Sequence, residues 1–531
     1  MNKDQQLSNQ SHAEIDRRVQ SWRNKSTKLA VIAAIFIMSF AVSFAPTMEA
    51  YVPVPTTMQA RVTHTVVPSD AQATCTVESK TFNNWFVKGI VTANGLVKPA
   101  NSVNFNDTTP NPPVPNTINC NFYQWAEQMF LWLTSPIPSS NGDGGHVFNS
   151  STFYTVLEDG TMIPNMNGIN AIGIRKDKTV DGQADGRNAA LMGQGEQLVY
   201  YSMHVNDVYA YFAKQNLPVS TTSPYTLKFP TTQKELDAIV QYAKKQGVEI
   251  PDPMALAMEL KIAWVEVKNG MDTSKYVTMQ AEIPTFSKSQ DNAVWAHTGK
   301  KTALLAMVGM HVVGSVAGHP EMIWATYEHD TNTPNAQYSY VNKNGDVITR
   351  AQEISQNMLF AADGSVGPFN QEHMRGVGIK ENRALNLVRL GNFAVSPSDT
   401  LRLFPWGAND QVPNPNVPSA AVSNTEIISI NNNIRSMLNG DDVRKNYLLI
   451  GATWTKGGVA PSVMPLPPGT TSNQVGTSSL ANSTMETYVT KQNNLNNCFA
   501  CHTGQQTRTG PNTNTVAISH IFTGLNTKNV K

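Results

Sequence analysis

The chain has 531 residues, and 40 lysines and arginines against 39 aspartates and glutamates leave a formal net charge of +1. This balance argues against a nucleic-acid partner, which would need a basic surface, and against an acidic interaction tail. Only 15% of the residues are charged, while glycine (34 residues) and proline (31 residues) are abundant. Such a composition suits an exported, loop-rich protein that contains β-structure.

Residues 1–48 predict an export segment. A basic run that includes Arg17, Arg23 and Lys28 precedes the apolar stretch Leu29–Phe44. A positive region before an apolar one is typical of a signal peptide. The stretch is shorter than the roughly 20 residues of a full membrane span, and no clean cleavage site follows it, so a retained membrane anchor is the alternative. In both cases the rest of the chain is expected in a bacterial periplasm or on the outer face of the inner membrane.

Residues 49–480 predict one large β-rich exported body, in which Cys75 and Cys120 are the only cysteines. Because the expected compartment is oxidising, these two residues are candidates for a disulfide with each other. Two separate free thiols are the alternative.

Three segments of the body predict helices. In residues 121–134 the apolar side chains recur at helical spacing and stop before Pro136. Residues 233–246 follow a capping box formed by Thr232 and Glu235. Residues 426–439 carry an apolar stripe that ends at a glycine.

The remaining strong segments predict strands, because they are rich in valine, isoleucine, threonine and aromatic residues. Two of them should form a hairpin through the connection 317–320, which holds a glycine and a proline. The predicted fold class is α+β, with a β-dominated antiparallel main body and several packed helices. The predicted strands are Gln197–Val208, Leu260–Val267, Tyr276–Phe286, Ala303–Val316, Glu321–His329 and Tyr447–Trp454.

Two polar groups in the body are weaker candidates for chemistry. His319, Glu321, Glu328 and His329 lie close in sequence and could assemble a metal or acid/base site, with ordinary hydrogen-bonded strand ends as the favoured alternative. Asp181–Gly186 resembles a calcium-binding turn, but it lacks the glutamate that an EF-hand loop requires, which favours a surface loop.

The C-terminal segment, residues 481–531, contains Cys498-Phe499-Ala500-Cys501-His502. This C-x-x-C-H pattern is typical of covalent c-type haem attachment: two thiols form thioethers with the haem vinyl groups, and the histidine becomes an axial iron ligand. A zinc site would need two more ligands nearby, and a redox dithiol would need a βαβ context; neither flanks the motif. One covalent haem c is therefore the predicted cofactor, with a stray disulfide or another metal site as alternatives.

The second axial ligand is less defined by the sequence. Only 29 residues follow His502 and none is methionine, so we expect the body to supply much of the haem pocket. His520, flanked by Ile518, Ile521 and Phe522, is the first candidate for the distal ligand. An open distal site is one alternative. The other is a ligand from the body, chosen from His204, His311, His319, His329 and Met485.

Residues Asn497–His502 resemble the attachment motif of c-type cytochromes. The wider pattern is similar to a group of uncharacterised bacterial "cytochrome c family" proteins, in the segments Phe122–Pro136, His319–His329 and Leu480–His502. This resemblance implies a haem c protein with an exported location, and it implies nothing about a substrate.

The predicted function is electron transfer through one covalent haem, with a redox partner protein or a small-molecule donor or acceptor. The first alternative is a haem-dependent oxidoreductase that acts on peroxide, oxygen or an organic substrate at an open iron site. The second is a haem-based binding or sensor module. The size of the body favours an enzyme, while the absence of an identifiable acid or base beside the motif argues against one.

Overall fold

The fold is that of a computed structural model. It describes residues 61–107, 120–137, 145–157, 160–165, 170–171, 191–217, 227–361, 374–378, 385–389, 395–408, 419–461, 473–485, 498–502 and 516–525. The predicted export segment and the predicted acidic turn at 181–186 lie outside these residues. Gln59–Lys531 form one compact unit, so the described parts of the C-terminal segment belong to the same unit as the body. Over the described ranges, no helix is long and apolar enough to cross a membrane.

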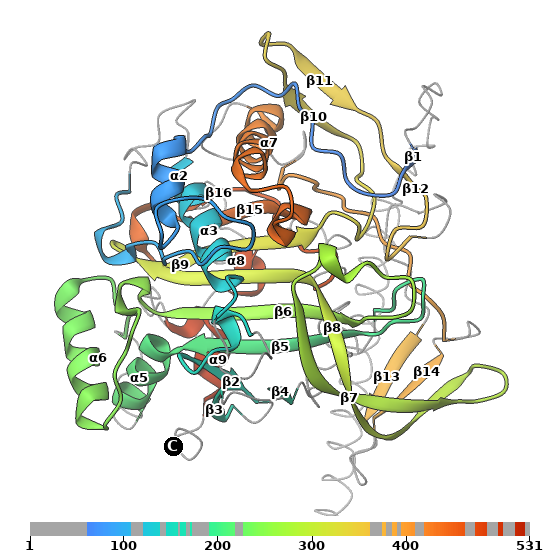
Figure 1. The fold of residues 1–531 in the computed structure, drawn as a ribbon, viewed down its shortest axis with the longest axis horizontal. Coiled ribbons are helices and arrows are strands. Elements are labelled where there is room, and N and C mark those ends of the chain that lie inside the picture. Colours follow the sequence, from blue (N-terminus) through green and yellow to red (C-terminus); the bar gives the residue numbers. More distant parts are fainter. Residues whose placement is uncertain are drawn as a thin grey trace, which may run out of the picture. The chain divides into compact units, whose positions relative to one another are not determined.

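A twelve-stranded sheet forms the centre of this unit (Figure 1). Eight strands follow one another along its main path, and every neighbouring pair on that path is antiparallel. The predicted α+β, β-dominated antiparallel class is therefore confirmed. In spatial order the path contains β16 (Gln474–Gly476), β15 (Tyr447–Thr455), β9 (His319–His329), β8 (Val294–Val316), β6 (Met258–Glu266), β5 (Val199–Asn206), β2 (Phe153–Val156) and β3 (Met162–Pro164).

Further strands extend the sheet beside β8. The long first half of β8 pairs with β7 (Thr278–Lys288), and β7 also pairs in parallel with β4 (Asn170–Ala171). The start of β8 pairs with β14 (Leu385–Arg389), which pairs with β13 (Met374–Gly378). Two small sheets lie apart from it: β1 (Arg61–Val62) with β12 (Ile354–Ser355), and β10 (Tyr338–Val341) with β11 (Val347–Arg350).

The structure changes the boundaries of several predicted elements. β8 begins at Val294 rather than at Ala303. Its first half is polar and has no apolar pattern, so the sequence did not predict it, but this half pairs with β7. The hairpin of β8 and β9 forms with a tighter turn than predicted. Val316 pairs with His319, which leaves only two residues in the turn, and Gly318 has the positive φ that such a turn needs. Pro320 therefore lies in β9.

One of the helices that were not predicted replaces the end of a predicted strand. Residues 197–208 were expected to form one strand, but β5 ends at Asn206 and α5 (Asp207–Asn216) begins at once. The Asn206 side chain accepts a hydrogen bond from the backbone N–H of Tyr209, so it caps the new helix. The first residues of this helix include aromatic side chains, which are also common in strands, and composition therefore favoured a strand.

The predicted helices are present, and helices lie on both faces of the sheet. α7 begins at Ala420, earlier than predicted, because the Ser419 hydroxyl caps it. α6 has the expected capping box between Thr232 and Glu235. The helices are α2 (Ser79–Trp85), α3 (Cys120–Leu133), α5, α6 (Gln233–Lys245), α7 (Ala420–Met437), α8 (Cys498–Cys501) and α9 (His520–Gly524).

Alternate side chains of β9 point into two different cores. Ile323 and Tyr327 belong to the core that holds α3, where Phe130 stacks on Tyr327 with 4.1 Å between ring centroids. Met322 and Trp324 belong to the core on the opposite side, which also holds α5 and α9. We call these sides the α3 face and the α5 face of the sheet.

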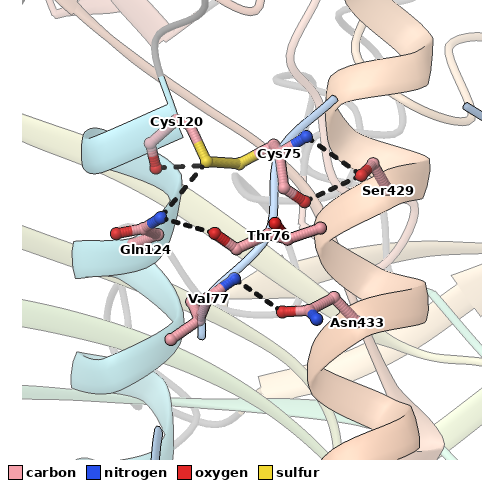
Figure 2. Close-up of a disulfide and its surroundings, with 7 residues drawn as sticks. All are labelled: Cys75, Thr76, Val77, Cys120, Gln124, Ser429 and Asn433. Carbon is pink, nitrogen blue, oxygen red and sulfur yellow. Dashed lines mark hydrogen bonds between the residues drawn. A yellow bond between two sulfur atoms is a disulfide. The ribbon is translucent and has the colours of Figure 1, made fainter. Parts of the chain in front are cut away.

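Cys75 and Cys120 form a disulfide with a Cα–Cα distance of 5.2 Å (Figure 2). Cys120 opens α3, while Cys75 lies in the segment that runs between α3 and α7. The Ser429 hydroxyl on α7 donates to the Cys75 carbonyl oxygen (2.7 Å) and accepts from its N–H (3.0 Å). Asn433 accepts from the N–H of Val77 (2.7 Å). The disulfide and these hydrogen bonds together fix three distant segments to one another.

Replacing both cysteines, Cys75→Ser with Cys120→Ser, is expected to lower the free energy of unfolding by about 2–4 kcal/mol, because the bond closes a loop of 45 residues in the unfolded chain. Denaturant titration of the oxidised wild-type chain and of the double variant measures the difference. A reducing agent should destabilise the wild-type chain and leave the variant unchanged. Equal midpoints for all four samples would contradict the prediction.

Candidate functional site

The C-x-x-C-H motif is wound into a single helical turn. α8 runs from Cys498 to Cys501, and the backbone N–H of His502 donates to the Cys498 carbonyl oxygen at 2.9 Å. Residues separated by four positions lie on the same side of a helix, so Cys498 and His502 share one side of this turn. Both side chains are partly exposed, whereas Phe499 between them is buried in the core on the α5 face.

A hydrogen bond shows which nitrogen of the His502 ring carries a proton. Its Nδ1 lies 2.7 Å from the carbonyl oxygen of Ile518, at the end of the 3-10 helix Val516–Ile518. A carbonyl oxygen can only accept, so Nδ1 carries the proton and Nε2 carries the lone pair. Metal-binding histidines are commonly oriented in this way, with one nitrogen donating to a carbonyl and the other left for the metal.

Two rings pack against the His502 imidazole. The Trp324 ring of β9 lies 4.3 Å away between centroids, and the His520 ring lies 4.1 Å away at an interplanar angle of 24°. The Trp324 indole is itself fixed, since its N–H donates to the Glu321 carbonyl oxygen at 2.9 Å. The lone pair of Nε2 lies in the plane of the imidazole, so packing on the faces of the ring is compatible with a metal at its edge.

These residues fit a covalently attached haem. Cys498 supplies a partly exposed thiol, and His502 supplies an imidazole in the tautomer that iron requires. Phe499, Ile518 and Trp324 supply buried apolar surface beside them. When bound, a haem c would add one-electron exchange between ferric and ferrous iron to this site.

His520 lies next to His502, at the first residue of α9, and its side chain is exposed. The two imidazoles face each other, so their Nε2 lone pairs, which lie in the ring planes, do not converge on one point between the rings. Ligation of a single iron by both residues would require one ring to turn. His520 as a distal ligand stays a prediction.

A buried serine fastens the C-terminal segment to the body. The Ser519 hydroxyl accepts from the N–H of Phe522 (3.0 Å) and thereby caps α9. It donates to the carboxylate of Glu259 on β6, and it lies 2.8 Å from the Tyr209 hydroxyl on α5. Burial, with the nearby charge of Glu259, raises the pKa of Tyr209 well above its usual value, so the phenol keeps its proton. The sequence could not reveal this contact, because Ser519 and Glu259 are 260 positions apart.

Apolar packing strengthens the same attachment. Phe522 packs against the rings of Phe212 (5.8 Å between centroids) and Phe229 (5.8 Å), and Ile521 is buried in the same core. Ile521 and Phe522, which flank His520, therefore pack on the body, on the α5 face of the sheet.

The four polar residues of β9 do not assemble into one site. His319 lies at one end of the strand between Asp107 (3.1 Å) and Glu321 (2.8 Å). Glu328 pairs with Arg402 at 2.7 Å. His319 and His329 are the first and last of the eleven residues of this strand, so about 33 Å separates them. Among the residues that the structure describes, no group of three or more histidine, cysteine, aspartate or glutamate side chains is arranged to hold a metal ion.

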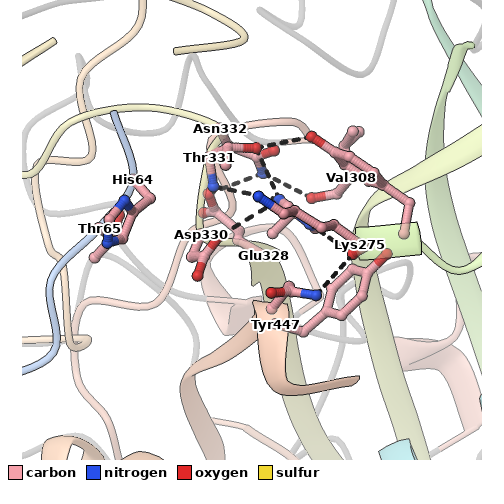
Figure 3. Close-up of polar contacts among 12 residues, drawn as sticks. His64, Thr65, Lys275, Val308, Glu328, Asp330, Thr331, Asn332 and Tyr447 are labelled. Carbon is pink, nitrogen blue, oxygen red and sulfur yellow. Dashed lines mark hydrogen bonds and ion pairs between the residues drawn. The ribbon is translucent and has the colours of Figure 1, made fainter. Parts of the chain in front are cut away.

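His329 at the other end of β9 is buried and hydrogen-bonded through both ring nitrogens. Its Nδ1 lies 2.8 Å from the Thr331 hydroxyl and its Nε2 lies 3.0 Å from the Lys275 carbonyl oxygen. Burial lowers the pKa of His329 to about 3, so the ring is neutral. Beside it Asn332 donates to the Val308 carbonyl oxygen at 2.6 Å, which closes the polar network at this end of the sheet (Figure 3).

Comparison of the chain with protein-family models, with curated proteins and with solved structures finds no match. The function must therefore be argued from the residues of the chain itself.

Replacing Ser519 with alanine should loosen the C-terminal segment, because it removes a helix cap and leaves the Glu259 carboxylate buried without this donor. The expected cost is about 1–3 kcal/mol. Hydrogen exchange of the amides of 516–525 should speed up while that of β6 and β8 stays slow. Thr523→Ala is the matched control, because Thr523 is exposed on the same helix. Equal exchange in the two variants would contradict this account.

The Asp107–His319–Glu321 group predicts a pH-dependent stability. Burial lowers the pKa of His319, but hydrogen bonds and charges from Asp107 and Glu321 outweigh burial and raise the pKa to about 9. Because this exceeds the ordinary value of 6.5, the stabilisation is complete below pH 6.5 and is lost as the pH rises through 9.

The loss of stability caused by His319→Gln should thus be larger at pH 6 than at pH 10 by about 3 kcal/mol. Denaturant titration of both chains at the two pH values gives this difference and cancels the titration of other groups. A loss that is the same at both pH values would contradict the prediction.

Proposed function

We propose that this protein is an exported monohaem c-type cytochrome that transfers electrons through a covalently bound haem. The observation that carries the proposal is the His502 hydrogen bond: the motif forms one helical turn, and the Ile518 carbonyl accepts from Nδ1 of its histidine, so that Nε2 is the nitrogen that would bind the iron.

Each residue of the turn has a defined task in this proposal. Cys498 and Cys501 would hold the haem through thioether bonds, and His502 would be the proximal axial ligand. The Ile518 carbonyl keeps the proton on Nδ1 and makes the imidazole a stronger donor. Trp324 and Phe499 keep water away from one side of the site, and such burial is one of the factors that set a haem potential.

The Cys498–Cys501 turn is docked on the body and is not a free, mobile tail, and this docking supports a role in electron transfer. His502 contacts Trp324 in the middle of β9, and Ser519 is bonded to β6. A cofactor held on a sheet needs little rearrangement when its charge changes, because the surrounding groups are already fixed. The donor or acceptor would be a redox partner protein or a small molecule.

Export is supported by the chemistry of the cysteines. The Cys75–Cys120 disulfide is of the kind that persists in oxidising compartments such as the bacterial periplasm. We propose a location in the periplasm or on the outer face of the inner membrane, with Leu29–Phe44 as a cleaved signal or as an anchor.

The proposal is tested by producing the full chain in a bacterium that attaches c-type haem in its periplasm. The wild-type protein should keep its haem on a denaturing gel and give a haemochrome spectrum with one haem per chain. The double variant Cys498→Ala with Cys501→Ala should lose the covalent haem, because no thioether can form.

Cys75→Ser with Cys120→Ser is the matched control, since it also removes two cysteines, but these form a disulfide on the α3 face. This control should retain its haem. A wild-type chain that carries no covalent haem under these conditions would overturn the proposed function.

A further inference from the structure

The loop that follows α2 carries exposed apolar side chains. The exposed fractions of Val87, Ile90 and Leu96 are 52%, 59% and 38%, although side chains of this kind are usually buried. They are three of the seven large apolar residues that are exposed over the described ranges, and they lie within ten consecutive positions. We call residues 87–96 the apolar loop.

The exposure follows from the pairing of the two sides of the loop. Phe86 forms an antiparallel bridge with Val97, and both side chains are buried in the core on the α3 face. One position further into the loop, the N–H of Val87 donates to the Leu96 carbonyl oxygen at 2.9 Å. Successive side chains of an extended chain point to opposite sides, so Val87 and Leu96 point away from this core.

Hydrogen bonds to the body hold the apolar loop in this conformation. The buried Arg444 guanidinium donates to the Gly95 carbonyl oxygen at 3.0 Å. The Asn94 N–H donates to the Asp442 carboxylate at 2.9 Å, and the Asn94 side chain accepts from the N–H of Val443 at 2.9 Å. The apolar side chains cannot turn inward without breaking these contacts, so their exposure is a property of the fold.

The surroundings of the apolar loop are basic. Residues 79–106 contain no aspartate or glutamate. The nearest exposed carboxylates on the flanking segments are those of Glu78, before α2, and Asp441, whose carbonyl oxygen accepts from the Asn94 amide at 3.5 Å. Three exposed lysines lie on the loop or beside it: Lys80, Lys88 and Lys98.

Apolar side chains beside lysines fit a lipid surface better than a protein surface. Interfaces between proteins are enriched in aromatic residues and arginine and depleted in lysine, whereas the apolar loop contains no aromatic residue and no arginine. Aliphatic side chains on a membrane-bound surface enter the boundary between head groups and acyl chains, about 5–10 Å deep. Ammonium groups beside them are attracted to anionic head groups.

We propose that the apolar loop docks the exported protein on an anionic phospholipid surface. The three exposed apolar side chains enter the lipid, and the lysines face its anionic head groups. The inference rests on the proposed export of the chain, but it does not require the haem. It places the protein at the face of a membrane whether or not Leu29–Phe44 is cleaved.

The experiment uses residues 59–531, exported behind a cleavable leader and loaded with haem, because they form one compact unit and because Leu29–Phe44 would itself insert into lipid. Vesicles of phosphatidylcholine, with and without phosphatidylglycerol, are sedimented and the bound protein is measured at low and high salt. The wild-type chain should bind the anionic vesicles most strongly, and salt should weaken this binding. Hydrogen exchange of the amides of 87–96 should slow when these vesicles are present.

The apolar contribution is tested by the triple variant Val87→Ser, Ile90→Ser and Leu96→Ser. It should weaken binding at least about tenfold, because less apolar surface leaves water on docking. Ile90→Ser alone is compared with its matched control Ile163→Ser, since Ile163 is also an exposed isoleucine but lies on β3. The control should bind like the wild-type chain, and unfolding midpoints show whether each variant is folded.

The contribution of charge is tested by Lys88→Gln with Lys98→Gln. Binding to the anionic vesicles should fall by about fivefold for each lysine and should depend less on salt, while binding to phosphatidylcholine alone stays the same. Lys245→Gln with Lys343→Gln is the matched control, because both lysines are exposed on other elements of the chain.

Two outcomes would overturn the inference. A wild-type chain that stays in the supernatant with the anionic vesicles would exclude lipid and would leave a partner protein as the occupant of the loop. A folded triple variant that binds as tightly as the wild-type chain would show that another surface binds the lipid. Covalent haem, measured in the same preparations, tests the proposed function separately: a chain that lacks haem but binds vesicles through the loop refutes that function and supports the inference.

Discussion

The hydroxyl of Ser519 is the contact on which the arrangement of the site depends. It joins α9 to Glu259 on β6 and to Tyr209 on α5. Because the contact is buried, losing the hydroxyl would leave the Glu259 carboxylate without this donor. Ile518, one residue earlier, accepts the hydrogen bond from His502. The sheet therefore fixes the position of the His502 imidazole through two adjacent residues, Ile518 and Ser519.

The two faces of the sheet are packed in different ways. The α3 face is closed by aromatic stacking, such as Phe122 on Trp454 at 3.8 Å, and by the disulfide that ties α3 to the N-terminal part of the unit. A buried ion pair, Arg444 with Asp442 (2.5 Å), also lies on this side, where Arg444 donates to the Leu131 carbonyl oxygen of α3. The α5 face holds the turn Cys498–Cys501, whose Phe499 is buried in the core on that side.

Local patterns in the sequence predicted much of this fold. The capping box of α6 and the apolar stripe of α3 depend on residues a few positions apart, and each formed as expected. The Cys498–His502 motif was equally visible, because its spacing is set by one turn of chain. The helix α5 was missed, since the cap at Asn206 interrupts a segment whose composition suits a strand.

The rest of the site depends on strand register, which composition does not encode. Nothing in the sequence showed that the candidate ligands His204 and His329 are buried with both ring nitrogens in hydrogen bonds, because these contacts form only after the strands have paired. The contact between Trp324 and His502 joins residues that are far apart in the chain for the same reason. A one-residue slip in β9 would turn Trp324 to the α3 face and remove the contact.

The ends of the main sheet path have a consequence for the behaviour of the protein at high concentration. The two strands that close the path, β16 and β3, are three residues long, and β3 ends in Pro164, which has no N–H to offer. Long edge strands would expose a template on which a second molecule could add its own strand. Short edges at both ends of this path reduce that template.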